Sequence, residues 1–502
     1  MRSRRIPIAA VARKQLLSVS RRCPRAHRFC TVAHDRNLIP DAEVISLLGS
    51  TKDCRVVELG AGIGRFTAEI APEATSVIAL DFMQNLIDQN KISNGHLGNI
   101  DFRCGDATQL SLPPASADVV FSNWLLMYLS DAEVEKLAQN MLTWLDEDGI
   151  IFFRESCFRQ SGDKSRSNNP THYRNPRQYF EIFDKTKIER EDGGYDYFEL
   201  IVCKSIDTYA KVKQNQNQVC WKWRKTSAPG KASSSNDLRY FLDRQYSVEG
   251  ISRYQMMFGD GFVSPGGITT TKEYAKMLGV SADDSVLDIG CGIGGAAFHI
   301  STTYGCFVHG LDLSVNMIMG ALEASATSQA AGCKASFEVS DAEKREYGAE
   351  VYDAVFSRDV FLYVKDKEAL LNKIWRCLKP GGRLVFTDYC GSDRGAYSDA
   401  FGRYVSEKAF NLASVGEYEA MIARAGFGCH KAEVVTDKLI EVTEAEISNL
   451  DGARDELIVN RSMSTEQLDN LKTSWENRLQ FAKDGEHSWM LFYAQKSYGE
   501  KA

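Results

Sequence analysis

The sequence lacks the features that mark membrane proteins, disulfide scaffolds and nucleic-acid-binding proteins. Its 502 residues contain no run of 18 apolar residues, so no membrane-spanning helix is expected. The 13 cysteines are scattered and form no Cys-x-x-Cys pair, which favours reduced cytosolic thiols over disulfides or a zinc site. A formal net charge of −7 leaves no domain-wide basic surplus, which argues against general nucleic-acid binding. We expect neither a metal nor a nucleic-acid partner.

The N-terminal segment, residues 1–34, has no acidic residue at all. It contains eight arginines and one lysine, and the first acid is Asp35. An Arg-rich, acid-free segment resembles an organelle transit peptide, but a disordered basic extension or a misassigned start codon fits the same composition. We therefore leave this extension out of the fold. The expected location is the cytoplasm, with a mitochondrion or plastid as the alternative if the extension is a targeting signal.

A glycine-rich loop occurs twice in the chain. The copies are VVELGAGIGRF and VLDIGCGIGGA, and the landmarks that follow each copy repeat at a nearly constant offset. Internal repeats of this kind indicate two copies of one domain in tandem. The matched positions, which lie 230 to 235 residues apart, are Gly60 and Gly290, Asp81 and Asp312, Asp106 and Asp341, and Ser122 and Ser357.

Strand and helix patterns alternate within each copy, which predicts an α/β fold with a mainly parallel sheet covered by helices on both faces. The first domain is predicted over residues 41–224 and ends in two strand-like runs, YFELIVCKSI and VCWKWRK, that form a closing hairpin. Residues 225–237, KTSAPGKASSSND, have a linker composition. The second domain, residues 238–502, opens with a long helical lead, and its KPGG sequence predicts a turn before a late strand.

The repeated loop predicts a nucleotide-like ligand. Glycines allow a tight turn and close approach of a ligand to the backbone, and an acid at the end of the second strand suits a ribose diol. Both NAD(P) and S-adenosylmethionine fit this pattern. The methyl donor is favoured because acids precede each loop at Glu58 and Asp288, and because Arg65 replaces the third glycine of a dinucleotide fingerprint. The second copy does satisfy that fingerprint through Gly295.

Several flanking segments are more specific than the loop. The first unit contains FSNWLLMYL, FFRESCFRQSGD, NPTHYRNPRQY and QNQNQVCWKW, and the second contains QYSVEGISRYQMMFGDGFVSPGG, SRDVFLYV and LVFTDYC. From about residue 41 to the C-terminus the chain resembles, in the same domain order, the tandem phosphoethanolamine N-methyltransferases of plants. The resemblance implies two Rossmann-like class I methyltransferase domains. It also implies three successive methylations of phosphoethanolamine to phosphocholine with S-adenosylmethionine, the first in domain one and the later two in domain two.

The resemblance also implies site residues in the first unit. Tyr128 is the candidate proton acceptor, although a tyrosine packed in the core fits the sequence equally well. The cofactor residues would be Gly60, Arg65, Asp81, Asp106, Ala107 and Asn123. The phosphate pocket would use Ser156, Ser161, Gly162 and Tyr173.

In the second unit the helical lead would act as a lid over the ligand. Tyr246 and Tyr363 would form the catalytic pair, and Tyr389 and Lys408 would bind substrate. The cofactor residues would be Gln245, Tyr246, Tyr254, Val263, Ser264, Gly290, Asp312, Asp341 and Arg358.

The chain departs from the family pattern at substrate positions. Tyr363 stands where the SRDxxLH pattern has histidine, and a phenol is a poor base at neutral pH unless its pKa is lowered. Lys408 and Phe410 stand where the pattern has arginine and tyrosine, so a bidentate fork and a hydroxyl are lost. We therefore expect the second unit to bind S-adenosylmethionine but to methylate slowly or to accept another substrate. Residues 1–40 also show no clear helix to close over the first site.

Two alternatives remain open at this stage. The chain could methylate another small molecule, such as a sterol, a tocopherol-like phenol or arsenite, although arsenite would need three converging cysteines. It could instead be a pseudoenzyme in which one or both units bind cofactor only to regulate or scaffold. The sequence predicts no oligomeric state.

Overall fold

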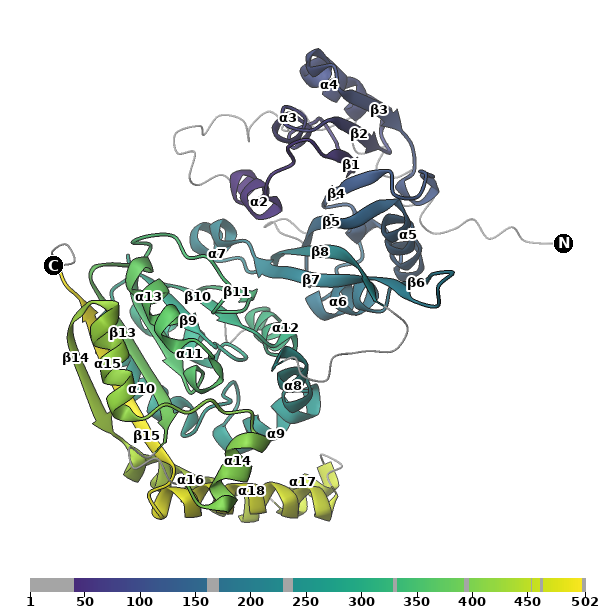
Figure 1. Ribbon diagram of the computed structural model, residues 1–502. Helices are drawn as coiled ribbons and strands as arrows, with labels where there is room; N and C mark the ends of the chain where they lie inside the picture. The colour runs from purple at the N-terminus through teal and green to yellow at the C-terminus, as the bar shows by residue number, and fades with distance from the viewer. Residues whose placement is uncertain are drawn as a thin grey trace. The chain divides into compact units, whose positions relative to one another are not determined.

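The computed structural model describes residues 40–159, 171–228, 238–327, 332–391, 397–452, 454–460 and 464–498. The chain divides into two compact units, Met1–Ser233 and Ser234–Ala502 (Figure 1). The basic extension at residues 1–34 and residues 229–237 of the expected linker lie outside the described part.

The first unit is built on a seven-strand sheet in the order β7-β8-β5-β4-β1-β2-β3, with the short β6 paired to β7. The five strands from β5 to β3 along this order are parallel, and β8 and β7 close the sheet as antiparallel strands. The strands are β1 (Arg55–Leu59), β2 (Ser76–Asp81), β3 (Ile100–Cys104), β4 (Ala117–Asn123), β5 (Leu145–Ser156), β6 (Lys187–Glu189), β7 (Tyr195–Ser205) and β8 (Gln218–Ala228). The helices are α2 (Pro40–Leu48), α3 (Thr67–Ile70), α4 (Gln84–Asn94), α5 (Asp131–Trp144), α6 (Pro176–Asp184) and α7 (Asp207–Lys213).

Local sequence explains these elements. The central strands are short apolar runs with side chains buried on both faces, as a sheet covered by two helical layers requires. Helix α5 begins at a capping box in which Ser130 and Glu133 satisfy each other's backbone N–H groups. A core containing Val56, Val119 and Phe152 joins the sheet to its helices. The parallel strands place all their carboxyl ends at one edge, where ligands bind in such folds.

The second unit repeats this topology, with strand order β14-β15-β13-β12-β9-β10-β11. Its strands are β9 (Ser285–Ile289), β10 (Phe307–Asp312), β11 (Lys334–Val339), β12 (Tyr352–Arg358), β13 (Leu378–Cys390), β14 (Phe427–Val434) and β15 (Ser488–Lys496). Its helices are α8 (Leu238–Gln245), α9 (Val248–Phe258), α10 (Gly267–Ala275), α11 (Gly295–Tyr304), α12 (Val315–Ser325), α13 (Lys367–Cys377), α14 (Asp399–Glu407), α15 (Val415–Ala425), α16 (Thr436–Gly452), α17 (Arg454–Asn460) and α18 (Thr465–Lys483). The tandem Rossmann-like fold predicted from the repeat is therefore confirmed.

Two sequence-based expectations were wrong. The first four linker residues, 225–228, belong to β8, because their backbone pairs with β7 as far as Ala228. The KPGG sequence lies inside β13, where the register with β12 shifts and the chain continues as strand. The expected helical lead is present as α8 and α9, which are separate helices because the side chain of Ser247 caps α9 and interrupts the helical run. The expected closing hairpin pairs as predicted, but α7 lies between its strands.

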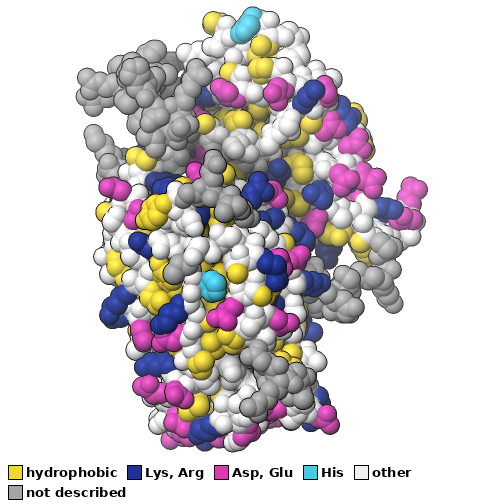
Figure 2. Space-filling view, turned by 60° about the vertical axis from the view of Figure 1, so that its left-hand side comes forward, with side chains coloured by type: hydrophobic (Ala, Val, Ile, Leu, Met, Phe, Trp, Pro, Cys, Tyr) yellow, Lys and Arg dark blue, Asp and Glu magenta, His cyan; other side chains and the backbone are white. Residues whose placement is uncertain are grey.

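The C-terminal helices were not predicted. α16 and α18 pack with α9 around a small apolar cluster that contains Phe258, Leu468 and Trp475. Within this cluster the buried Arg478 donates to Glu446 at 2.9 Å. Among the described helices, none combines the length and hydropathy that crossing a bilayer requires. Figure 2 shows acidic and basic side chains interspersed over the visible face.

Candidate functional site

Each glycine loop leaves the carboxyl end of the first strand of its unit in a left-handed conformation. The φ angles are +79° at Gly60 and +71° at Gly290, which favour glycine at both positions. In the first unit Asp81 accepts the N–H of Gly62 at 2.9 Å, and in the second Asp312 accepts the N–H of Gly292 at 3.0 Å. The acids predicted to bind the ribose therefore also hold the loops in shape.

The acids that precede the loops are buried beneath them. Burial raises the pKa of Glu58 to about 8 and that of Asp288 to about 7. Glu58 accepts a hydrogen bond from the hydroxyl of Thr67. The matching position in the second unit is Ala297, and Asp288 Oδ2 has no hydrogen-bond partner among the described residues. The second loop thus encloses an oxygen that can still accept a hydrogen bond.

The third acid of each unit begins a turn after the third strand. Asp106 accepts the backbone N–H of Thr108 at 2.9 Å, and Asp341 accepts that of Glu343 at 3.0 Å. Ala107 is buried directly after Asp106. The two units therefore present the same turn at the same edge of the sheet, as their matched spacing predicted.

A tyrosine-bearing turn packs against each glycine loop. These turns contain the 3-10 helices η6 (Leu126–Tyr128) and η9 (Phe361–Tyr363). A Cβ placed on Gly60 would lie 3.3 Å from Cβ of Leu125, and one on Gly290 would lie 2.0 Å from Cγ2 of Val360. The candidate catalytic tyrosines are therefore carried by turns in direct contact with the candidate cofactor loops.

The residue that starts each turn has a strained backbone. Trp124 and Asp359 have φ angles of +56° and +57°, which non-glycine residues adopt at a cost of about 1–3 kcal/mol. Trp124 Nε1 donates to Gln218 at 2.8 Å, and Trp489 Nε1 donates to Asp359 at 2.7 Å. Such strain persists where the surroundings enforce it and clusters at functional sites. Sequence reasoning overlooked Asp359, although it stands within the SRD motif; its Oδ2 has no hydrogen-bond partner among the described residues.

In each unit a buried arginine links the fourth and fifth strands of the chain order. The arginine lies on the fifth strand, β5, in the first unit and on the fourth strand, β12, in the second. In the first unit Arg154 Nε donates to Asn123 at 2.7 Å. In the second unit Arg358 Nε donates to Thr387 at 3.1 Å. Arg358 also donates to Pro265, Thr270 and Thr271, which secures the start of α10. Arg358 therefore holds the protein's own backbone and hydroxyl groups at this edge.

Helix α2, which the sequence did not reveal, is linked by ion pairs to the first site. Asp41 of α2 forms an ion pair with Arg65 at 3.1 Å and lies 3.9 Å from Arg154. A Cβ on Gly62 would meet nothing within 4 Å, so this side of the first loop is open. α2 is thus tied to a predicted cofactor residue.

The predicted substrate residues of the first unit converge in part. The backbone N–H of His172 donates to Met127 at 2.7 Å, which places the segment carrying Tyr173 beside the turn carrying Tyr128. Ser156 is buried at the end of β5 and accepts from Gln218 at 2.5 Å. The other two predicted phosphate residues, Ser161 and Gly162, lie outside the described residues.

The predicted lid of the second unit covers its glycine loop. A Cβ on Gly292 would lie 2.7 Å from Cγ2 of Val263, and Ser264 follows in the same half-buried segment. A side-chain hydrogen bond joins Tyr246 and Tyr363. Gln245 donates to the hydroxyl of Tyr254 at 3.4 Å. The structure thus brings together residues more than 100 positions apart that the sequence had paired.

Burial raises the pKa of both tyrosines of this pair, and their hydrogen-bonded contact raises that of Tyr246 further. Neither phenol is therefore poised to ionise near neutral pH. The hydrogen bond can orient the two hydroxyls, but Tyr363 does not supply the base that a histidine would.

The predicted substrate residues Tyr389 and Lys408 lie around an aromatic cluster. The ring of Phe410 lies 5.6 Å from that of Tyr363 and 6.2 Å from that of Tyr389. Burial lowers the pKa of Lys408, and the nearby charge of Arg478 lowers it further. Two basic side chains therefore lie close together in this cluster. Sequence reasoning missed three members of this cluster because they follow no motif: Tyr404, Arg478 and His487.

His487 and Arg478 have unsatisfied nitrogen atoms. The His487 ring lies 4.4 Å from the ring of Tyr389 and is fully buried. Neither of its ring nitrogens, nor Arg478 Nε, has a hydrogen-bond partner within the described part of the chain. Burial beside Arg478 lowers the pKa of His487 to about 3, so the ring is neutral. Such groups are costly unless an acceptor or water reaches them.

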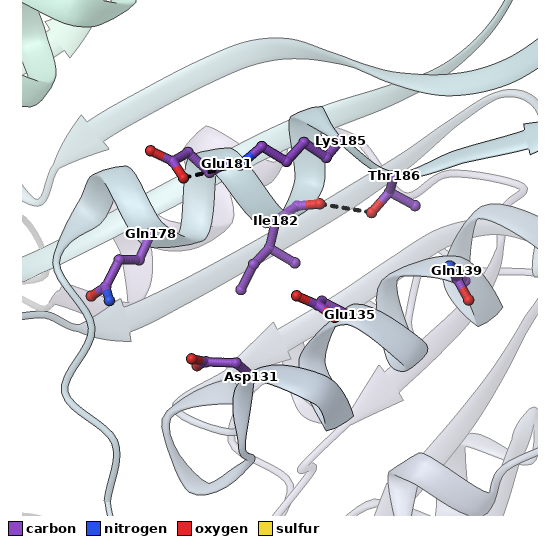
Figure 3. Close-up of a pocket in the computed structure, with 8 residues that line it drawn as sticks. All are labelled: Asp131, Glu135, Gln139, Gln178, Glu181, Ile182, Lys185 and Thr186. Carbon is purple, nitrogen blue, oxygen red and sulfur yellow. Dashed lines mark hydrogen bonds and ion pairs between the residues drawn. The ribbon is translucent and has the colours of Figure 1, made fainter. Parts of the chain in front are cut away.

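A separate pocket of about 400 Å³ lies in the first unit between α5 and α6 (Figure 3). Figure 3 shows Asp131 and Glu135 of α5 facing Gln178 and Ile182 of α6 across it. Asp131 already accepts from the buried Arg174 at 2.7 Å. None of the predicted site residues lines this pocket, so it is distinct from the edge that carries the glycine loop.

Comparisons with known proteins agree with the geometry. Residues 56–149 and 281–446 each match a family model described as a methyltransferase domain. The chain is 42% identical over 457 residues to phosphoethanolamine N-methyltransferase of Triticum aestivum, covering 90% of this chain and 88% of the relative. It is 43% identical over 460 residues to phosphoethanolamine N-methyltransferase 3 of Arabidopsis thaliana, covering 91% of each.

A solved structure is similar over both units. Phosphoethanolamine N-methyltransferase 2 of Haemonchus contortus, in complex with phosphomonomethylethanolamine and S-adenosylhomocysteine, superposes with a TM-score of 0.72 at 25% identity, covering 91% of this chain and 99% of that one. Two methyltransferase folds in tandem and near-complete coverage of the relatives leave one assignment: the chain belongs to the phosphoethanolamine N-methyltransferase family.

Proposed function

We infer that this chain is an S-adenosylmethionine-dependent enzyme that methylates the nitrogen of phosphoethanolamine towards phosphocholine. The observation that carries this inference is 42% identity to a phosphoethanolamine N-methyltransferase over 90% of the chain. The matched region contains both glycine loops and both tyrosine turns. A pseudoenzyme without any activity is the outcome that the experiment below would expose.

The two loops fit the cofactor. Gly62 and Gly292 adopt left-handed conformations, and having no side chain they leave the backbone accessible to a ligand. Asp81 and Asp312 accept the N–H groups of these glycines and so lie directly beside them. When bound, S-adenosylmethionine supplies a sulfonium-activated methyl group. Asp288 has an unpartnered oxygen beneath the second loop that can accept a hydrogen bond.

The protein must also bind and deprotonate the substrate amine. A primary amine has a pKa of about 10, so it arrives protonated and cannot attack. We propose that Ser156 and Tyr173 bind the phosphate in the first unit, with Ser161 and Gly162. Tyr128, on the turn that contacts the glycine loop, orients the amine and accepts its hydrogen bond.

We propose that the second unit binds the same class of substrate but works more slowly. The cations Lys408 and Arg478 suit a phosphate monoester, and the aromatic rings of Tyr363 and Phe410 suit a methylated ammonium group. Proton removal is the weak step, because burial keeps Tyr363 in its neutral form. Lys408 adds a point charge where the family pattern has a bidentate fork.

The test uses the full chain with labelled S-adenosylmethionine and phosphoethanolamine, and it follows each methylated intermediate. Asp81→Ala should abolish the first methylation, and Asp312→Ala should abolish the later ones. Asp101→Ala is the matched control, because Asp101 is an exposed acid on β3 of the first unit. No methylated product from the wild type would disprove the enzyme assignment. Loss of the first step in Asp312→Ala with its retention in Asp81→Ala would disprove the division of labour.

A further inference from the structure

The turn that carries Tyr128, residues 125–129, is held from its amide side by a buried carboxylate. Glu155 follows the buried arginine of β5 and is fully buried. Its carboxylate accepts the backbone N–H groups of Leu125 at 3.1 Å, Leu126 at 2.7 Å and Met127 at 3.3 Å. These are the donors that a helical turn leaves unpaired at its start, so one carboxylate satisfies the whole amide end of the turn.

A buried guanidinium holds the same turn from its carbonyl side. Arg174 donates to the carbonyl oxygen of Leu126 at 3.0 Å and to that of Leu129 at 2.6 Å. Its Nε donates to Asp131 at 2.7 Å, and its side chain lies over the ring of Tyr179. The guanidinium has a planar set of donors, which lets it reach three acceptors at once.

Arg174 also belongs to the second segment that faces the site. It follows Tyr173 directly, and His172 donates its backbone N–H to Met127 within the turn. The carbonyl of Arg174 accepts from the N–H of Phe158, just after β5. The turn with Tyr128 and the segment with Tyr173 are therefore fastened to each other and to β5 by hydrogen bonds from one buried acid and one buried guanidinium.

The second unit has a weaker version of the same arrangement. Asp388 stands at the position of Glu155 and accepts a single backbone N–H of its turn, that of Leu362 at 3.1 Å. Lys367 donates to the carbonyl of Val364 at 2.8 Å and to that of Asn411 at 2.5 Å. Both units therefore place an acid on the amide side and a cation on the carbonyl side of the tyrosine turn, but only the first unit uses a guanidinium.

We propose that Glu155 and Arg174 are positioning residues of the first unit, which set Tyr128 and Tyr173 relative to each other and to the glycine loop. Neither of the two residues is assigned a contact with substrate or cofactor. Their effect is on orientation, because a displacement of about 1 Å in an active site can cost about a hundredfold in rate. The proposal rests on the function proposed above, since it concerns the first methylation.

The test replaces the guanidinium of Arg174 by an amine that keeps the positive charge. Arg174→Lys retains one cation but cannot reach Leu126, Leu129 and Asp131 together. We expect kcat for the first methylation to fall about tenfold or more, while the Kd for S-adenosylmethionine at the first site changes much less, because Arg174 donates to Leu126, Leu129 and Asp131 and not to the glycine loop. Arg190→Lys is the matched control, since Arg190 is an exposed arginine that also pairs with an acid, Asp192. Asp312→Ala is added to every chain so that only the first site binds cofactor.

Each outcome decides the proposal. A normal first methylation in Arg174→Lys overturns it, and so does an equal loss in Arg190→Lys. A parallel loss of cofactor binding and turnover in Arg174→Lys also overturns it, because that result indicates general damage to the unit. If Arg174→Lys does not fold, Glu155→Gln is measured in the same way, since it keeps one carbonyl acceptor for the turn. Absence of activity in the wild type would instead disprove the proposed function.

Discussion

Substitution of alanine for Gly290 should disable the second site through its contact with the tyrosine turn. The new Cβ would lie 2.0 Å from Cγ2 of Val360. The left-handed φ of +71° costs alanine about 1–2 kcal/mol, and the lower entropy of the unfolded chain returns about 0.4–1 kcal/mol. Overpacking against Val360 adds about 1–3 kcal/mol. The second unit should therefore lose about 1–5 kcal/mol of unfolding free energy.

Gly485→Ala is the matched control in the same unit. Gly485 has a φ of +73°, but a Cβ there would meet nothing within 4 Å. Its variant incurs the backbone cost alone, about 0–1.6 kcal/mol after the unfolded-state term. Denaturant titration measures both losses, and calorimetry on chains that also carry Asp81→Ala measures cofactor binding at the second site. Because Val360 leads into Tyr363, later methylations should fall about tenfold or more in Gly290→Ala only. Equal unfolding losses in the two variants, with normal binding, would refute the steric argument.

Two further substitutions test the electrostatics of the second unit. Burial raises the pKa of Asp288 to about 7 in the folded state, above its usual value of 3.8. The folded state therefore holds this proton more tightly than the unfolded state, and the resulting stability declines as pH rises from about 4 to about 7. Asp288→Asn should make that fall smaller, by roughly 1–3 kcal/mol, in thermal unfolding measured from pH 5 to pH 8; an unchanged slope would contradict the assigned pKa. Tyr363→His introduces an imidazole that accepts a proton near neutral pH, so the later methylations should accelerate about tenfold or more. No acceleration in product analysis would show that another group removes the proton.

Local and repeated features could be predicted because they depend on residues that are close together in the sequence. The alternation of strands and helices within each unit was predicted correctly, since strands such as those at residues 55–59 and 76–81 are short apolar runs. The matched offsets located both glycine loops, and the family resemblance singled out Tyr128 and Tyr363. The family assignment was confirmed by the relatives. The roles of the individual site residues stay predictions, because no ligand contact tests them.

Features that depend on distant partners could not be predicted. The helices at residues 436–452 and 465–483 carry mixed polar sequences, and their stability comes from packing on α9. Arg478 and His487 follow no motif, and Arg174 lies in a segment quoted for the resemblance but was given no role, because the significance of all three arises from neighbours far along the chain. Arg154 lies on the fifth strand of its unit and Arg358 on the fourth strand of the other, and their equivalent position between the two strands cannot be recognised without the strand register.

The sequence by itself determined that two methyl-donor loops exist, because glycine spacing and strand-end acids are local requirements of one backbone turn. Only the tertiary structure decided how each loop is coupled to chemistry. The glycines contact the tyrosine turns through side chains 65 and 70 positions later, and buried acids from other strands accept the backbone N–H groups of those turns. The two units share the loop because it is local, and they differ at the substrate edge because long-range packing assembles it differently in each.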